Sequence, residues 1–231
     1  MKKLLVLTGP QGSGNHLWSK IFSANPEVNG WKQLTEEYWV GHGDEPFADV
    51  WEDPSIFNDY DWKDGYHFTS ISCPYVIRGG PEMDTDGGGR IPKYDQFIAS
   101  AKLAGFEVVV GVLGRDHNIL THQQARIRKA VTTHRFLDAY DKFLVKYNPV
   151  FLSTEMLHLY QDRYLTQLEQ QLQFPIKIQH DNLLAILKDN ANAKYIAPIE
   201  KYWLDDYMKK NAVNHGRLDN PYKYTKGGQK P

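Results

Sequence analysis

The chain has 231 residues, 41% of them hydrophobic and 24% charged, with a formal net charge of −1 at pH 7, as expected for a globular protein with one buried core. The near-zero charge argues against a nucleic-acid partner, and a single cysteine, Cys73, excludes an intrachain disulfide and a cysteine-rich zinc site. No apolar run approaches the roughly 20 residues that cross a bilayer, so we expect a cytoplasmic, reducing location and no membrane partner.

The chain opens with a pattern typical of nucleotide-binding α/β domains. Residues 3–8 (KLLVLT) form an apolar run that predicts a strand buried on both faces. The run is too short for the hydrophobic region of a signal peptide. A glycine-rich stretch follows at 9–15, and residues 16–24 have helical spacing before Pro26. Strand, glycine loop and helix in this order favour a phosphate-binding loop.

Residues 36–90 read as a loop-rich insert around a strand at 67–73. Within 36–65 there are ten acidic and seven aromatic residues. Aromatic faces stack on rings and sugars, so the stretch predicts either an acceptor cleft or a satellite core under a long loop. The glycine-rich loop at 79–89 contains Glu82, Asp84 and Asp86, but it lacks the closing glutamate of a calcium loop, so we expect no metal there.

The second half alternates helices with strands. A helix is predicted at 94–104, a strand at 106–113, one or two helices across 118–147, a strand at 150–153 and a helix at 154–172, with further helices at 182–188 and 200–210. The tail from 213 to 231 is predicted to be irregular. We therefore expect one domain over residues 1–231, a three-layer α/β/α fold with a mostly parallel sheet.

The glycine loop departs from the nucleotide-triphosphatase pattern G-x-x-x-x-G-K-[ST]. Gly9 and Gly14 match it, but Asn15 and His16 replace the lysine and the hydroxyl residue. The lysine binds the β- and γ-phosphates and the hydroxyl holds Mg²⁺, so their absence argues against a kinase or ATPase and for a site that requires no metal.

The same loop resembles the first loop of sulfotransferases, which reads roughly P-[KR]-S-G-T-T. Pro10, Ser13 and Gly14 carry the resemblance, and either Gln11 or Gly12 stands where the family has its basic residue. The resemblance implies a P-loop nucleotide-binding fold and the donor 3′-phosphoadenosine 5′-phosphosulfate. It also implies that Gln11, Gly12, Ser13, Gly14 and Asn15 bind that donor.

Two later segments resemble the family in matching order. Residues 107–126 resemble its strand that ends in an Arg-Asp or Arg-Asn pair, which implies that Arg115 and the hydroxyl of Thr121, or of a neighbour, bind the 3′-phosphate. Residues 148–175 resemble its short strand, Tyr-Glu-x-Leu turn and closing helix, with Thr154 to Leu157 standing for the turn. Arg115 follows a strand at its carboxyl end, where open α/β sheets bind ligands.

Sulfonate transfer also needs a base that takes a proton from the acceptor. We expect the acceptor to be a small molecule or a glycan. His16 at the loop and His42 between two glycines are the catalytic candidates, with His67, Glu36 and Glu37 as alternatives. Basic residues of the tail (Arg217, Lys223 and Lys226) predict either a loop over the nucleotide or an irregular tail. Two other functions stay open: a nucleotide or small-molecule kinase with a degenerate loop, and a phosphate-loop module without catalysis. The sequence does not indicate an oligomeric state.

Overall fold

The computed structural model describes residues 1–29, 47–75, 89–178 and 181–188, which all belong to one compact unit, Met1–Asn190. The predicted helix at 200–210 and the tail at 213–231 lie outside the described residues. Five strands form one sheet in the order β2-β3-β1-β4-β5, and every pairing in it is parallel. The strands are β1 (Lys2–Pro10), β2 (Val28–Asn29), β3 (Gly65–Cys73), β4 (Phe106–Gly114) and β5 (Val150–Ser153).

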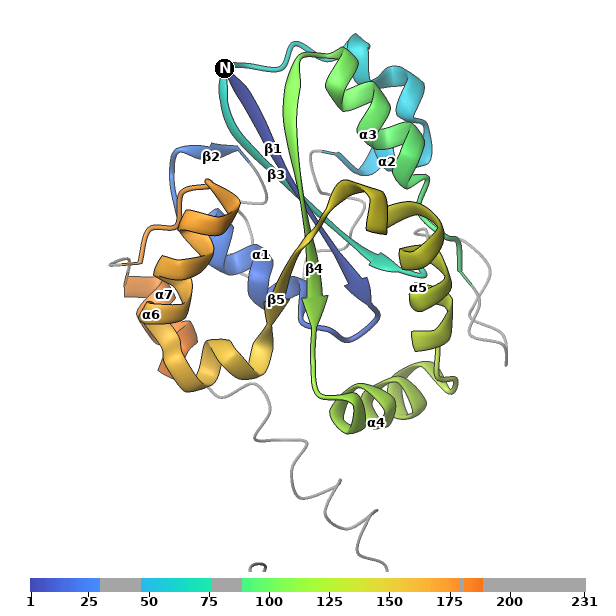
Figure 1. Ribbon diagram of the computed structural model, residues 1–231, viewed down its shortest axis with the longest axis vertical. Coiled ribbons are helices and arrows are strands. Elements are labelled where there is room, and N and C mark those ends of the chain that lie inside the picture. Colours follow the sequence, from blue (N-terminus) through green and yellow to red (C-terminus); the bar gives the residue numbers. More distant parts are fainter. Residues whose placement is uncertain (30–46, 76–88, 179–180, 189–231) are drawn as a thin grey trace, which may run out of the picture. The chain divides into compact units, whose positions relative to one another are not determined.

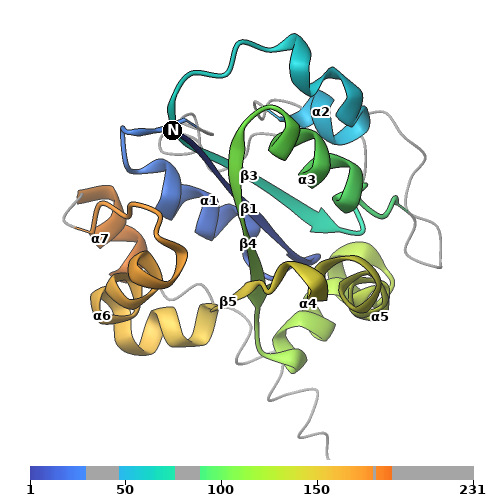
Figure 2. The same ribbon diagram turned by 45° about the horizontal axis from the view of Figure 1, so that its top comes forward.

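Helices join the strands and cover both faces of the sheet (Figures 1 and 2). They are α1 (Asn15–Ser23), α2 (Ala48–Glu52), α3 (Tyr94–Leu103), α4 (His117–Arg128), α5 (Thr133–Ala139), α6 (Thr154–Leu172) and α7 (Asp181–Lys188). Short 3₁₀ or π turns occupy η3 (Pro54–Asp59), η4 (Tyr140–Leu144) and η5 (Val145–Tyr147). The predicted α/β/α fold class is confirmed, and the edge strand β2 is an element that the sequence did not indicate.

Side-chain alternation along β1 divides the core into two halves. Leu4 and Val6 pack with α2, α3 and α5 on one face, whereas Leu5 and Leu7 pack with α1, α6 and α7 on the other. Because successive side chains of a strand point to opposite faces, a central strand covered on both sides must be apolar at every position. This explains why residues 3–8 lack the alternation of a half-exposed strand.

Three aromatic residues in the described part of the predicted insert belong to the core. Phe47, Trp51 and Phe57 are almost fully buried, and the Trp51 ring stacks on Phe97 with centroids 3.7 Å apart. The Trp51 Nε1–H donates to Thr69 Oγ1 over 3.0 Å, which satisfies its buried polar atom. The structure thus favours the core interpretation for this part of the stretch. Because β3 lies next to β1, residues 65–73 of the predicted insert are part of the sheet itself.

The basic segment after β4 forms two helices with a break between them. Lys129 adopts a left-handed conformation (φ 60°) and Thr132 turns inward, where it is fully buried. Helix α6 covers the predicted residues, but its path breaks at Gln161 (φ 45°). Among the described residues, no helix is both long enough and apolar enough to cross a membrane.

Candidate functional site

The carboxyl ends of the parallel strands meet at one edge of the sheet, and the chain leaves β1 and β4 there in opposite directions. From β1 the chain runs through α1 to β2 and β3 on one side, whereas from β4 it runs through α4 and α5 to β5 on the other. Such a switch point is where open α/β sheets bind ligands. The loop after β1 and Arg115 after β4 both lie at this position.

The loop between β1 and α1 turns through two glycines with positive φ. Gly12 (φ 86°) and Gly14 (φ 102°) are both left-handed, which other residues rarely adopt. Ser13 N–H donates to Pro10 O (3.0 Å) and closes the turn, and the first helical bond of α1 runs from Trp18 N–H to Gly14 O (3.0 Å). Gly14 is the N-cap and has no side chain that could cap the N–H groups of the first turn. This arrangement directs amide groups and the positive end of the helix dipole towards the loop.

The polar side chains of the loop turn inward. Ser13 Oγ donates to Asn15 Oδ1 (3.1 Å), and Asn15 Nδ2 donates to Ser70 Oγ on β3 (3.1 Å). Ser13, Asn15 and Ser70 are all buried. Asn15, which stands where a nucleotide triphosphatase has its lysine, therefore ties the start of α1 to the sheet. What the loop offers a ligand is mainly its backbone.

The Arg115 side chain, which follows β4, contacts this loop. Its Nη1 donates to Gly12 O and to Gln123 Oε1, both over 2.7 Å. A Cβ at Gly12 would lie 3.1 Å from the Gln123 side chain, so that glutamine packs directly against the loop. The half-buried guanidinium is thereby held beside the middle of the loop by a residue of α4.

A buried amide network holds the start of the loop from the other side. Gln124 Nε2 donates to Gln11 O (2.6 Å), and Gln124 Oε1 accepts from Thr132 N–H (2.8 Å) and Thr133 Oγ1 (3.1 Å). Thr132 Oγ1 donates to Gln11 Oε1 (3.2 Å). The Gln11 side chain, predicted to bind the donor, thus faces this network. The sequence did not indicate Gln123 or Gln124, because nothing in a basic helix marks two adjacent glutamines as contacts of a loop more than 100 residues earlier.

The turn at Thr154 to Leu157 also reaches the loop. Thr154 Oγ1 donates to Ser13 O (3.3 Å), and Glu155 Oε1 accepts from the backbone N–H of Asp116 (2.9 Å). The Asp116 carboxylate accepts from Asn118 N–H (2.9 Å) and Ile119 N–H (3.0 Å) and so caps α4. Three segments that were singled out in the sequence therefore converge at one edge of the sheet.

Apart from His67, the remaining predicted residues lie in α1, in α4 or outside the described residues. His16 is half-buried at the second position of α1, directly after the loop. The Thr121 hydroxyl oxygen is buried within α4, with no hydrogen bond to the described residues. His42, Glu36 and Glu37 lie outside the described residues, as do Glu82, Asp84 and Asp86 and the basic residues of the tail.

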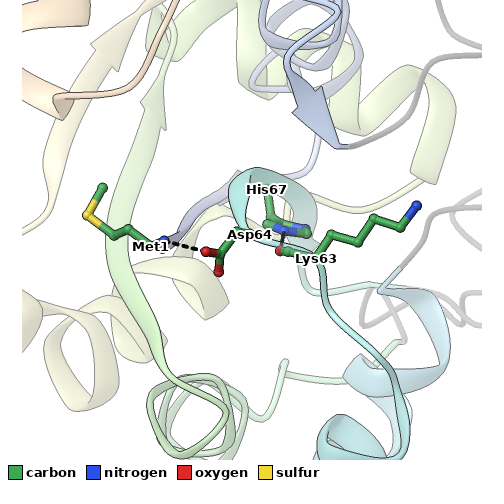
Figure 3. A network of polar contacts seen from close by, with 4 residues as sticks. All are labelled: Met1, Lys63, Asp64 and His67. Atoms are coloured by element: carbon green, nitrogen blue, oxygen red, sulfur yellow. Dashed lines mark hydrogen bonds and ion pairs between the residues drawn. The ribbon is translucent and has the colours of Figure 1, made fainter.

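His67 lies at the opposite end of the sheet, among aromatic side chains. It pairs with Leu4 near the start of β1, and its Nε2–H donates to Lys63 O over 2.8 Å (Figure 3). Its ring contacts Phe106 edge to face with centroids 5.0 Å apart. Burial lowers the pKa of His67. This position far from the loop does not suit a base for a reaction there.

Cys73 lies at the carboxyl end of β3 within the core. Burial raises the pKa of its thiol to about 11, against the usual 9.0, and Tyr94 hydrogen-bonds to it. The Tyr94 hydroxyl also shares a 2.6 Å hydrogen bond with Thr8 Oγ1. A buried thiol with a raised pKa is a poor nucleophile, so Cys73 is structural.

The donor set at the edge suits an anion. It combines backbone amides, a helix start and one guanidinium, which together favour phosphate or sulfate oxygens. Within the described part of the chain, no three His, Cys, Asp or Glu side chains gather as metal ligands would.

Comparisons with known proteins give one structural likeness. No protein-family model matches the chain, and no curated protein sequence matches it. A solved structure of mouse sulfotransferase SULT7A1 complexed with PAP is similar to it at 11% identity and a TM-score of 0.38. The likeness covers 84% of this chain and 65% of that protein's chain, so this chain spans less than two thirds of it. At this TM-score the likeness is too low to support function, which has to follow from the site itself.

Proposed function

We propose that this protein binds 3′-phosphoadenosine 5′-phosphosulfate at the loop after β1 and transfers its sulfonate to a hydroxyl or amine of a small molecule or glycan. One observation carries the proposal: the glycine loop and the uncapped start of α1 lie at the switch point of the sheet, and Arg115 donates a hydrogen bond to that loop. Gly12 and Gly14 permit the left-handed backbone of the loop, and the donors present match phosphate oxygens.

The loop suits a phosphosulfate better than a nucleotide triphosphate with Mg²⁺. Lysine and the metal-binding hydroxyl are replaced by Asn15 and His16. The Asn15 amide bonds to Ser70 and Ser13, so its side chain does not replace the lysine. A triphosphate carries charge that such a loop could not balance without its metal, whereas the sulfonate donor requires none in this proposal.

The bound donor supplies an S–O bond that breaks as the acceptor oxygen or nitrogen bonds to sulfur, and the bonding electrons remain on the 5′-phosphate. The amides of the loop and the start of α1 hold the phosphosulfate in place. Arg115 supplies the positive charge that stabilises the departing phosphate. Because the loop contains no cation of its own between Pro10 and Asn15, this arginine is the central residue of the proposal.

His16 is our proposed base, since it follows the loop directly and lies at its junction with α1. Imidazole titrates near neutral pH and could accept the proton that the acceptor loses. His42, the other candidate, stays a prediction from the sequence. His16→Gln would then lower the turnover rate and leave the affinity for adenosine 3′,5′-bisphosphate within about twofold of the original, because the glutamine removes the base and leaves the loop amides in place.

Thermal shift with two nucleotides tests the proposal. Adenosine 3′,5′-bisphosphate with a chelator should raise the melting temperature, because a ligand that binds only the folded state stabilises it. Stabilisation by ATP with Mg²⁺ alone would instead support a kinase. Release of the bisphosphate from the phosphosulfate donor, measured against a panel of hydroxyl and amine acceptors, tests transfer. Binding without transfer to any acceptor would support a module without catalysis.

A further inference from the structure

We infer that the Arg115 side chain, held by Gln123, binds the 5′-phosphate of the nucleotide and so supplies the positive charge that the loop lacks. This inference rests on the proposed function and differs from the role at the 3′-phosphate that the sequence resemblance implied. Arg115 would then be a specificity-determining residue for any ligand with a phosphate on the 5′ carbon.

The first argument is position. Arg115 Nη1 lies 2.7 Å from the carbonyl oxygen of Gly12, the residue at the centre of the loop. The loop and the start of α1 are the part of the site that cradles the 5′ group, whereas the ribose ring separates that group from a 3′-phosphate. A guanidinium that touches the loop backbone is therefore placed for the 5′ end.

The second argument is the device that keeps the arginine there. Both contacts of Nη1 are short, one to the loop and one to Gln123 Oε1, also 2.7 Å. The Gln123 side chain in turn packs against Gly12. Gln123 is thus a positioning residue: it fixes a long, flexible side chain in one orientation before any ligand arrives, which lowers the ordering cost of binding.

The third argument is charge. The Asn15 amide is bonded to Ser70, and the nearby Asp116 carboxylate caps α4. A 5′-phosphate with two negative charges therefore meets amide dipoles and the Arg115 guanidinium. Such a planar cation with several fixed donors is the side chain best suited to phosphate oxygens.

Three adenine nucleotides distinguish binding of the 5′-phosphate from binding of the 3′-phosphate. We would titrate the full chain, in a chelator, with adenosine 5′-monophosphate, adenosine 3′-monophosphate and adenosine 3′,5′-bisphosphate. Arg115→Gln removes the charge and keeps a polar side chain at this position. It should weaken the 5′-monophosphate and the bisphosphate by about 10- to 100-fold and leave the 3′-monophosphate unchanged. Arg126→Gln, which removes the same charge from an exposed position on α4, is the matched control.

The salt dependence of affinity distinguishes a role for the arginine's charge from a purely structural role in holding the loop. Affinity of the original protein for the 5′-monophosphate should fall with ionic strength, and this dependence should be weaker in Arg115→Gln. Gln123→Leu keeps the charge but removes one of the two contacts that hold Arg115 Nη1, so it should lower affinity less and keep the salt dependence. If Arg115→Gln does not fold, Arg115→Lys takes its place in this comparison. Its affinity for the 5′-monophosphate should lie between that of the original protein and that expected for Arg115→Gln.

Each other result overturns the inference. A loss confined to the 3′-monophosphate and the bisphosphate would place Arg115 at the 3′-phosphate. Equal affinities in Arg115→Gln and the original protein, or equal salt dependence, would make the arginine a brace of the loop alone. If the original protein binds none of the three nucleotides, the proposed function itself fails, and the inference fails with it.

Discussion

Replacing Gln124 by leucine should destabilise the protein strongly, because this side chain satisfies buried backbone groups from two distant segments. It donates to Gln11 O and accepts from Thr132 N–H, and all three residues are at most 3% exposed. Leucine has a similar volume, so little cavity forms, but both backbone groups lose their partner. A buried group left without a partner costs about 1–3 kcal/mol, which predicts a loss of about 2–6 kcal/mol for the pair.

Thermal unfolding followed by circular dichroism measures this loss. For a chain of this size, 1 kcal/mol corresponds to about 2–4 °C, so the midpoint should fall by roughly 4–24 °C. Gln167→Leu, at an exposed position of α6, is the control and should change the midpoint by less than about 2 °C. A midpoint for Gln124→Leu as close to the original as that of the control would refute the network as a stabilising element.

Three further predictions concern the loop, the thiol and the pH dependence of stability. Gly14→Ala and Gly105→Ala both place a side chain at positive φ (102° and 84°) and should each lose about 1–2 kcal/mol of stability. Only Gly14→Ala should also lose affinity for adenosine 3′,5′-bisphosphate in calorimetry, and equal affinity in the two variants would argue against the loop as the site. Cys73 should react with a thiol reagent at pH 8 at least tenfold more slowly than in the unfolded chain, since burial raises its pKa to about 11; an equal rate would show the thiol to be accessible. His67 has a pKa lowered by burial, so the folded state resists its protonation, and the free energy of unfolding should fall as pH drops below the usual 6.5 towards the lower pKa of the folded state. Urea unfolding at pH 7.5 and 5.5 measures this, and His67→Phe should show a smaller difference between the two pH values; an equal difference would assign it to other groups.

Local patterns were sufficient to predict most of the sheet. The apolar run at 3–8, the strand at 106–113 and the glycine loop are continuous in sequence, so their burial and conformation follow from neighbouring residues. The edge strand β2 has only two residues, which is too short for any periodic pattern to reveal.

The partners within the site depend on distant contacts and could not be predicted. Arg115 was placed at the edge of the sheet because it follows a strand, but its bonds to Gly12 and Gln123 depend on how α4 packs against the loop. Aromatic residues from 47 to 62 suited a cleft and a core equally by composition. What decides between them is the packing of Trp51 on Phe97 from α3 and its hydrogen bond to Thr69 on β3.

Titration calorimetry of the full chain with adenosine 3′,5′-bisphosphate, in the presence of a chelator, tests the central claim most directly. The proposed site predicts saturable binding with one nucleotide per chain and no need for Mg²⁺. No measurable binding of the bisphosphate, together with binding of ATP that requires Mg²⁺, would contradict it.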